Sequence, residues 1–147
     1  MSKTLIIIDD SEEDRYLARR TISSCGYDGD ILEFADGADF LELLGSEREF
    51  SNFRNENLEP YLVLLDINMP RVDGFSVAAE LSAWQERNNE RCWFVVMMLT
   101  SSSNPADMEK AKEYSLIREF ATKPLGVNQL KEVIDDAIGE TAEAPSY

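Results

Sequence analysis

The stretch of sequence that decides the fold is Tyr61-Leu-Val-Leu-Leu-Asp66-Ile-Asn-Met-Pro70, an apolar run that ends in one carboxylate and then a proline. Because polar and apolar residues do not alternate in this run, it predicts a strand buried on both faces, as in a parallel sheet. In open parallel sheets, ligands bind beyond the carboxyl ends of the strands, which is where Asp66 lies. Asp66 also has a plainer interpretation as a cap of the following turn, since aspartate readily bonds nearby backbone.

The composition excludes several classes of function. The chain has 147 residues, 44% of them hydrophobic, so we expect one domain with a well-formed core. Lys and Arg number 14 against 29 Asp and Glu, a net charge of −15, which argues against direct nucleic-acid binding. The chain contains no histidine, which excludes Ser-His and Cys-His nucleophilic mechanisms and histidine metal ligands.

Two further features concern the setting of the chain. Cys25 and Cys92 are far apart and lack CxxC spacing, so they predict neither a metal knot nor a redox pair. The N-terminal apolar run is too short for a signal segment, and no run reaches the roughly 18 apolar residues of a membrane span. We therefore expect a cytoplasmic protein that does not contact a membrane.

Five apolar runs alternate with amphipathic segments along the chain. The expected strands are residues 5–8, 31–34, 61–65, 92–99 and 117–120, and a helical pattern follows each of them. Such alternation specifies an α/β fold, a parallel sheet with helices on both faces. A flavodoxin-like, doubly wound sheet with strand order 2-1-3-4-5 is the usual solution. We expect one domain over residues 1–139 and a disordered acidic tail over residues 140–147.

Some local assignments are less defined. Asp10 or Ser11 can cap the first helix, and Glu13 or Asp14 then occupies the third position of a capping box. The side of this helix expected to face the core carries Leu17, Thr21, Ile22 and Cys25. Residues 46–60 are polar and predict an extended surface loop or a frayed helix end. Residues 85–91 are expected to carry the preceding helix into a polar connection to the fourth strand.

Side chains able to do chemistry gather where the predicted strands end: Asp9, Asp10, Asp66, Thr100 and Lys123. Two like charges about 4 Å apart cost about 4 kcal/mol at an effective dielectric constant of about 20, so three carboxylates cannot stay ionised there without a cation. Lys123 supplies one positive charge. Since the remaining ligands are hard oxygens, Mg²⁺ fits best, with Mn²⁺ or Ca²⁺ as substitutes.

This arrangement suits phosphoryl transfer. Asp66 could attack a phosphorus atom in line and form an aspartyl phosphate, while Thr100 and Lys123 could each bond a phosphoryl oxygen. Each residue also has a plainer interpretation: Asp10 as a helix cap, Thr100 as a strand-end hydroxyl and Lys123 as a solvated lysine. Their joint placement at one edge of the sheet favours a shared site.

These residues match a known family. The motifs are an acidic pair after the first strand, Leu-Asp66-x-Asn-Met-Pro-x-x-Asp73-Gly74, Leu-Thr100-Ser and Lys123-Pro124. Over residues 3–138 the chain resembles the receiver domain of two-component response regulators, which has the CheY-like fold. The resemblance implies that Asp66 is the phosphoacceptor and that Asp66, Thr100 and Lys123 are the catalytic residues.

The resemblance also implies a metal site and a switch. Mg²⁺ would be bound by Asp10 directly, by Asp9 through water, by Asp66 and by the backbone carbonyl of Asn68. The Lys123–Pro124 bond is expected to be cis. Phe120, three residues before the lysine, falls at the family's aromatic switch position, which Thr100 would control, although Phe120 also has a plainer interpretation as a core residue.

The expected function is that of a stand-alone receiver. It would accept a phosphoryl group from a histidine kinase or phosphotransfer protein and signal by phosphorylation-dependent partner binding or phosphorelay, with only self-phosphorylation and autodephosphorylation as catalysis. The downstream partner and a homodimer are left open. One alternative is an Mg²⁺-dependent phosphohydrolase of the haloacid-dehalogenase kind, but Asp66-Ile-Asn68 misses the DxD signature. A scaffold with a dead site is disfavoured by the intact Asp66, Thr100 and Lys123.

Overall fold

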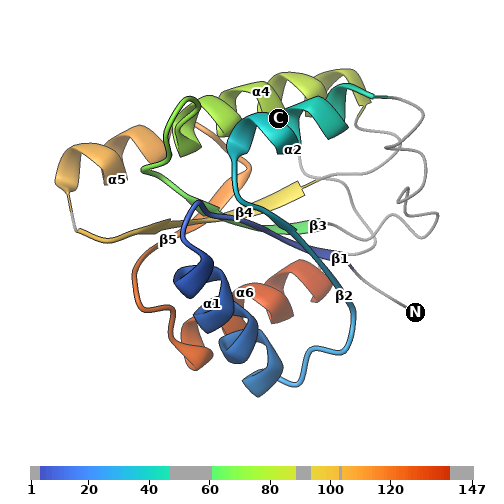
Figure 1. Cartoon of the computed structure of the whole chain (residues 1–147), viewed down its shortest axis with the longest axis vertical. Helices are drawn as coiled ribbons and strands as arrows, with labels where there is room; N and C mark the ends of the chain where they lie inside the picture. The colour runs from blue at the N-terminus through green and yellow to red at the C-terminus, as the bar shows by residue number, and fades with distance from the viewer. Residues whose placement is uncertain (1–3, 47–60, 89–93, 103, 140–147) are drawn as a thin grey trace.

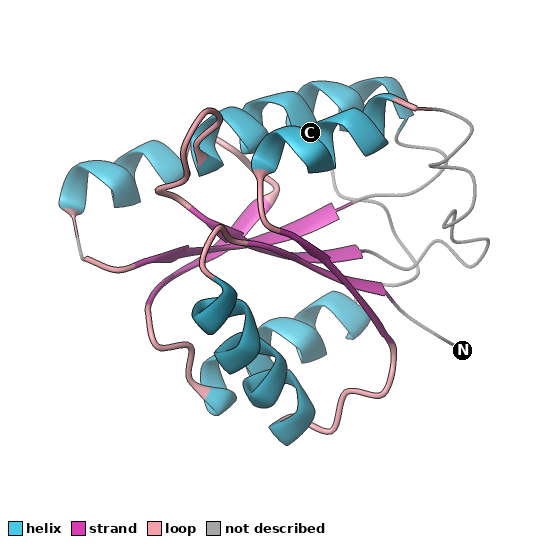
Figure 2. Cartoon of the chain, viewed as in Figure 1, coloured by secondary structure: helices cyan, strands magenta, loops and turns pink. Residues whose placement is uncertain are grey.

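The computed structural model describes residues 4–46, 61–88, 94–102 and 104–139. Within them the chain forms one sheet of parallel strands between two layers of helices (Figures 1 and 2). In chain order the elements are β1 (Thr4–Ile8), α1 (Glu12–Ser24), β2 (Asp30–Phe34), α2 (Gly37–Gly45), β3 (Tyr61–Asp66), α4 (Gly74–Asn88), β4 (Phe94–Thr100), α5 (Pro105–Ala111), β5 (Ile117–Thr122) and α6 (Val127–Gly139). Helices α1 and α6 cover one face of the sheet, and α2, α4 and α5 cover the other (Figure 1).

The strand order is β2-β1-β3-β4-β5, and every neighbouring pair is parallel. This order confirms the predicted flavodoxin-like fold. It also places β1 and β3 side by side, with Ile8 paired to Leu65, so that the residues following these two strands meet at one edge. Asp66 pairs with Leu99 of β4, which brings the end of β4 to the same edge.

Both faces of the sheet are buried, as the unbroken apolar runs predict. Successive strand residues point to opposite faces, so the core divides into two clusters. The cluster under α2, α4 and α5 takes Ile6, Ile8, Val63 and Leu65, and the cluster under α1 and α6 takes Leu5, Ile7, Leu62 and Leu64. Asp9 and Asp66 continue the second series by one step, which directs both carboxylates toward the α1 side of the sheet edge.

Side-chain caps explain where three helices begin. The Ser11 Oγ accepts a hydrogen bond from the Asp14 N–H at 3.1 Å and starts α1. Asp36 caps α2 through the Ala38 N–H at 2.7 Å, and Asn104 caps α5. Of the two caps considered for the first helix, Ser11 is therefore correct. The interpretation of Asp10 as the cap is wrong, so its carboxylate remains available at the sheet edge.

Two local predictions are wrong. Leu17 is 43% exposed, because the buried stripe of α1 passes through Ala18 and Ile22, one position further on. Gln85 is fully buried inside α4, where its Oε1 accepts a hydrogen bond from the Phe94 N–H at 2.9 Å. Residues 85–88 still belong to the helix, and Gln85 is not part of a polar surface, because its buried amide bonds the start of β4.

Other predictions fall outside the described residues. These are residues 47–60 of the predicted loop, residues 89–91 of the predicted connection, residues 92 and 93 of the predicted fourth strand, and the acidic tail over 140–147. Within the described residues, no helix combines the length and the apolar character needed to cross a membrane.

Gly74 lets α4 begin directly against the end of β3. A Cβ at this position would overlap the carbonyl oxygen of Asp66 and lie 2.9 Å from the Cα of Ile67. We expect Gly74→Ala to lower the free energy of unfolding by about 2 kcal/mol, the usual cost of overpacking against an immobile neighbour. Urea denaturation would measure this loss.

Gly45, the last residue of α2, provides the matched control. A Cβ there would meet no atom within 4 Å among the described residues. Gly45→Ala should leave stability unchanged or raise it by up to about 1 kcal/mol, because alanine loses less backbone entropy than glycine on folding. Equal effects of the two substitutions would contradict the close approach at Gly74.

Candidate functional site

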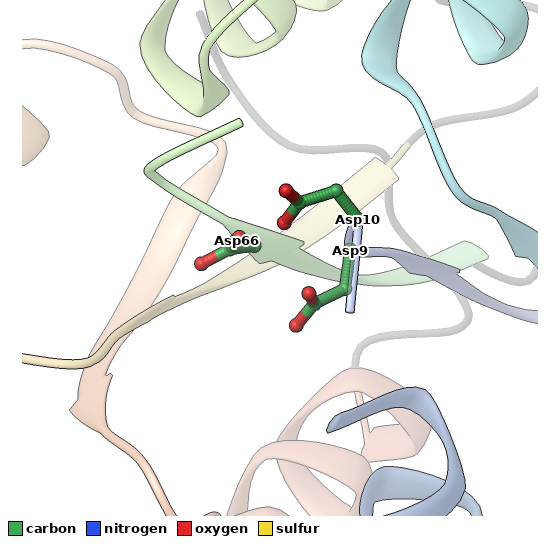
Figure 3. Close-up of side chains that lie close together, drawn as sticks. All are labelled: Asp9, Asp10 and Asp66. Carbon is green, nitrogen blue, oxygen red and sulfur yellow. The ribbon is translucent and has the colours of Figure 1, made fainter. Parts of the chain in front are cut away.

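Three carboxylates meet at the carboxyl ends of β1 and β3. Asp9 and Asp10 follow β1, Asp66 ends β3, and one carboxylate oxygen from each lies within 4.8 Å of the others (Figure 3). Asp9 and Asp66 are only 3% and 4% exposed, whereas Asp10 is exposed. The structure therefore brings together the three acids that the strand ends predicted, two of them out of contact with bulk water.

Lys123 lies inside this cluster. Its Nζ is 2.8 Å from Asp9 Oδ2, 2.8 Å from Asp14 Oδ2 and 3.2 Å from Asp66 Oδ1. Burial lowers the pKa of Lys123, but the hydrogen bonds to Asp14 and Asp9 and the charges of Asp9 and Asp66 outweigh burial and raise it above its ordinary value. The amine is thus a largely buried cation, and its interpretation as a solvated lysine is wrong.

One lysine does not balance the cluster. Burial, followed by the negative charge of Asp9, raises the pKa of Asp66 from 3.8 to about 6, even though the charge and hydrogen bond of Lys123 lower it. Keeping Asp66 ionised in the folded protein at neutral pH therefore costs free energy. A second cation would relieve that cost, and a set of carboxylate oxygens without sulfur or imidazole suits a hard divalent ion.

Thr100 is fully buried, and its hydroxyl is bonded to its own loop. The Oγ1 donates to the Ser102 carbonyl oxygen at 2.9 Å and accepts from the Ser102 N–H at 3.2 Å. The Lys123 N–H donates to the Thr100 carbonyl oxygen at 2.8 Å, so the backbones of the two residues are joined. The Lys123–Pro124 bond is cis, as expected.

Asn68 is exposed in the loop between β3 and α4, and that loop is anchored at two points. The Gly74 N–H donates to the Ile67 carbonyl oxygen at 2.8 Å. Arg71, which adopts a φ of 66° that is uncommon for a residue with a side chain, forms an ion pair with Asp36 at the start of α2. The hydrogen bond from Arg71 lowers the pKa of Asp36 below its usual value. The backbone around Asn68 is therefore fixed relative to the acids.

Phe120 lies in β5, where it pairs with Met98 of β4. It is partly buried and packs against the cluster under α2, α4 and α5, on the face of the sheet opposite to Asp9 and Asp66. Its position is compatible with a core residue and with a ring that moves between two packed positions.

Asp14 is the site residue that sequence reasoning missed, because it entered only as a candidate for a capping box. It lies in the first turn of α1 and contacts the Lys123 ammonium. Beside this pair is a cavity of about 470 Å³, lined among others by Asp14, Leu17, Arg20, Lys123 and Leu125. The signal that could have identified Asp14 is its place in the first turn of a helix that begins directly at the sheet edge.

The doubly wound sheet, with its acids and buried lysine at one edge, defines the class of CheY-like signalling domains. The chain belongs to the response regulator receiver domain family, whose model matches residues 5–135. It is 26% identical over 132 residues to the response regulator Rcp1 of Synechocystis, covering 90% of this chain and 84% of that protein. It is 25% identical over 140 residues to the polar-differentiation response regulator DivK of Brucella anthropi, covering 95% of this chain and 99% of that protein.

Solved structures agree on the fold. A two-component response regulator from Cytophaga hutchinsonii superposes with a TM-score of 0.78 at 23% identity, covering 95% of this chain and 98% of that chain. The Mn²⁺-bound form of response regulator Rcp1 superposes with a TM-score of 0.66 at 23% identity, covering 98% and 99%. At such identities these likenesses establish the architecture alone.

Proposed function

We propose that this receiver domain accepts a phosphoryl group on Asp66 from a histidine kinase or a phosphotransfer protein. The observation that carries the proposal is the meeting of buried Asp66 with Asp9, Asp10 and the Lys123 ammonium. A carboxylate nucleophile beside fixed positive charge is what transfer to an acyl phosphate needs.

The same proposal includes an Mg²⁺ ion held by the carboxylates of Asp10 and Asp66 and the backbone carbonyl of Asn68, with Asp9 acting through water. Support comes from the three hard carboxylate donors within 4.8 Å of one another, which Lys123 alone among the described residues balances through an ion pair. The relative Rcp1 has been solved with bound Mn²⁺, a similar hard cation. When bound, such an ion neutralises negative charge on the acids and on the phosphoryl oxygens.

Three residues of the chain would then take separate parts in the transfer of the phosphoryl group. A bond forms between an Asp66 oxygen and phosphorus as the bond between phosphorus and the donor breaks, and the donor leaves with that electron pair. Lys123 would hold a phosphoryl oxygen, a role that its distance of 3.2 Å from Asp66 Oδ1 supports. Thr100 would hold another after its hydroxyl gives up the two bonds to Ser102.

That exchange at Thr100 is the proposed start of the switch. Movement of the Thr100 side chain changes the space beside β5, and Phe120 would follow it into a more buried position. The surface of α5, β5 and α6 then changes shape and alters binding of a downstream partner, or the phosphoryl group passes on in a relay. Ring resonances of Phe120 that shift on phosphorylation in the wild type, but not in Thr100→Ala, are the expected result.

The setting of this function is part of the proposal. We propose that the domain signals as a receiver such as DivK does, since the likeness covers 99% of that protein. We also propose that it acts in the cytoplasm. Its catalysis would be limited to its own phosphorylation and dephosphorylation. The phosphohydrolase alternative gains no support from relatives, which are signalling proteins.

The decisive experiment incubates the full chain with a small-molecule phosphodonor and Mg²⁺ and measures the intact mass. We expect one added phosphoryl group in the wild type and none in Asp66→Asn. Asp28→Asn, at an exposed aspartate in the loop after α1, is the control and should be phosphorylated normally. Steady release of phosphate from unrelated monoesters would contradict the proposal and favour the hydrolase.

A further inference from the structure

The Lys123 ammonium has three N–H donors, and each one faces a carboxylate. The partners are Asp9 and Asp14, both at 2.8 Å, and Asp66 at 3.2 Å. The lysine side chain is 15% exposed, so these three acids, rather than water, balance most of its charge. If Asp9 and Asp66 bind a metal ion or a phosphoryl group, two of the three partners of Lys123 change their role. Asp14 is the partner that keeps its role.

The local structure of α1 leaves the Asp14 carboxylate available for this contact. In a capping box the acid at the third helical position would accept a hydrogen bond from the N–H of the cap residue. Here that N–H, on Ser11, donates instead to Asp9 Oδ1 at 2.9 Å. The Ser11 Oγ still accepts from the Asp14 N–H at 3.1 Å and fixes the backbone. Asp14 is thus held in place while its carboxylate reaches across to β5.

From this arrangement we infer that Asp14 is a positioning residue. It holds the Lys123 ammonium at the edge of the site while Asp9 and Asp66 give up their contacts with the ammonium to bind Mg²⁺ and a phosphoryl group. The inference rests on the proposed function. Without Asp14, the ammonium would move toward Asp9 and Asp66 and compete with Mg²⁺ for both. Asp14 therefore affects the Mg²⁺ affinity of the site indirectly, through its contact with Lys123.

The test measures Mg²⁺ binding to the unphosphorylated full chain by calorimetry. We expect Asp14→Asn to raise the Mg²⁺ dissociation constant roughly fivefold, the scale of coupling between residues in contact. Glu13→Gln removes the same charge one residue earlier, from an exposed side chain. Its effect should stay below about twofold, the scale for residues without shared partners. Asp14→Glu should restore much of the affinity, because a carboxylate remains.

A double-mutant cycle with Lys123→Met separates positioning from simple charge. When side chains stay in place, the effects of two charges on a third add, so Asp14→Asn would change the Mg²⁺ dissociation constant equally with and without Lys123. If Asp14 positions Lys123, the effect of Asp14→Asn in the Lys123→Met background should fall to that of Glu13→Gln. An additive cycle would overturn the inference.

The outcomes distinguish this inference from the proposed function. If the wild type is phosphorylated on Asp66 and the cycle is additive, only the role of Asp14 fails. If the wild type takes up no phosphoryl group, the proposed function fails, and the same cycle measured on the free energy of unfolding without metal still tests the contact. Coupling there between Asp14 and Lys123 supports the contact, and its absence overturns it.

Discussion

Replacing Lys123 by methionine is expected to lower the free energy of unfolding by about 3–5 kcal/mol at pH 7 without divalent metal, the range for removing one partner of a buried ion pair. Among the described residues, the Lys123 ammonium is the cation that forms ion pairs with both buried acids, Asp9 and Asp66, and it also forms one with Asp14. Its loss leaves the carboxylates facing one another at short range. Urea denaturation in the presence of a chelator would measure the change.

Two conditions should reduce this loss. At acid pH Asp66, whose pKa is raised to about 6, is protonated and no longer repels Asp9. Added Mg²⁺ should supply part of the missing positive charge, so it should stabilise Lys123→Met more than the wild type. Lys131→Met, at an exposed lysine on α6, is the control and should cost less than about 0.5 kcal/mol. A cost for Lys123→Met as small as that of Lys131→Met would show that Lys123 does not hold the acids together.

The site acids could be placed from sequence because they follow from topology. Unbroken apolar runs predict strands buried on both faces, and strand alternation with helices leaves few orders for the sheet. Once β1 and β3 are neighbours, Asp9 and Asp66 must come close, whatever the details of packing. Lys123 follows in the same way from the end of β5. These inferences need only the order of elements, which is the most strongly encoded property of this chain.

The features that sequence reasoning missed depend on rotations of single side chains. Asp14 was considered for a backbone bond at the start of α1, and only the structure shows Asp9 taking that bond instead. The polarity of Gln85 predicts the start of a polar stretch, although its spacing of four from Leu81 places it on the buried face of α4. The hydroxyl of Thr100 is turned to Ser102, a choice among rotamers that sequence does not encode.

Asp66→Asn should do the opposite of most substitutions in a buried site and stabilise the metal-free protein at pH 7. Burial and the charge of Asp9 raise the pKa of Asp66 from 3.8 to about 6, so ionised Asp66 opposes folding above that pH. Removing the charge should raise the free energy of unfolding by about 2 kcal/mol, somewhat less than the full shift implies. Lys123 remains balanced by Asp9 and Asp14 in the variant.

The difference in stability between the wild type and Asp66→Asn should depend on pH. Folded Asp66 binds its proton more tightly than unfolded Asp66, so the wild type loses stability relative to Asp66→Asn as pH rises from about 4 to about 6. Below about pH 4 both states are protonated and the difference should vanish. Saturating Mg²⁺ at pH 7 should reverse the order, because the ion favours the ionised wild-type carboxylate. Urea denaturation across this pH range measures the difference, and a variant less stable than the wild type at pH 7 without metal would show that Asp66 is ionised without cost.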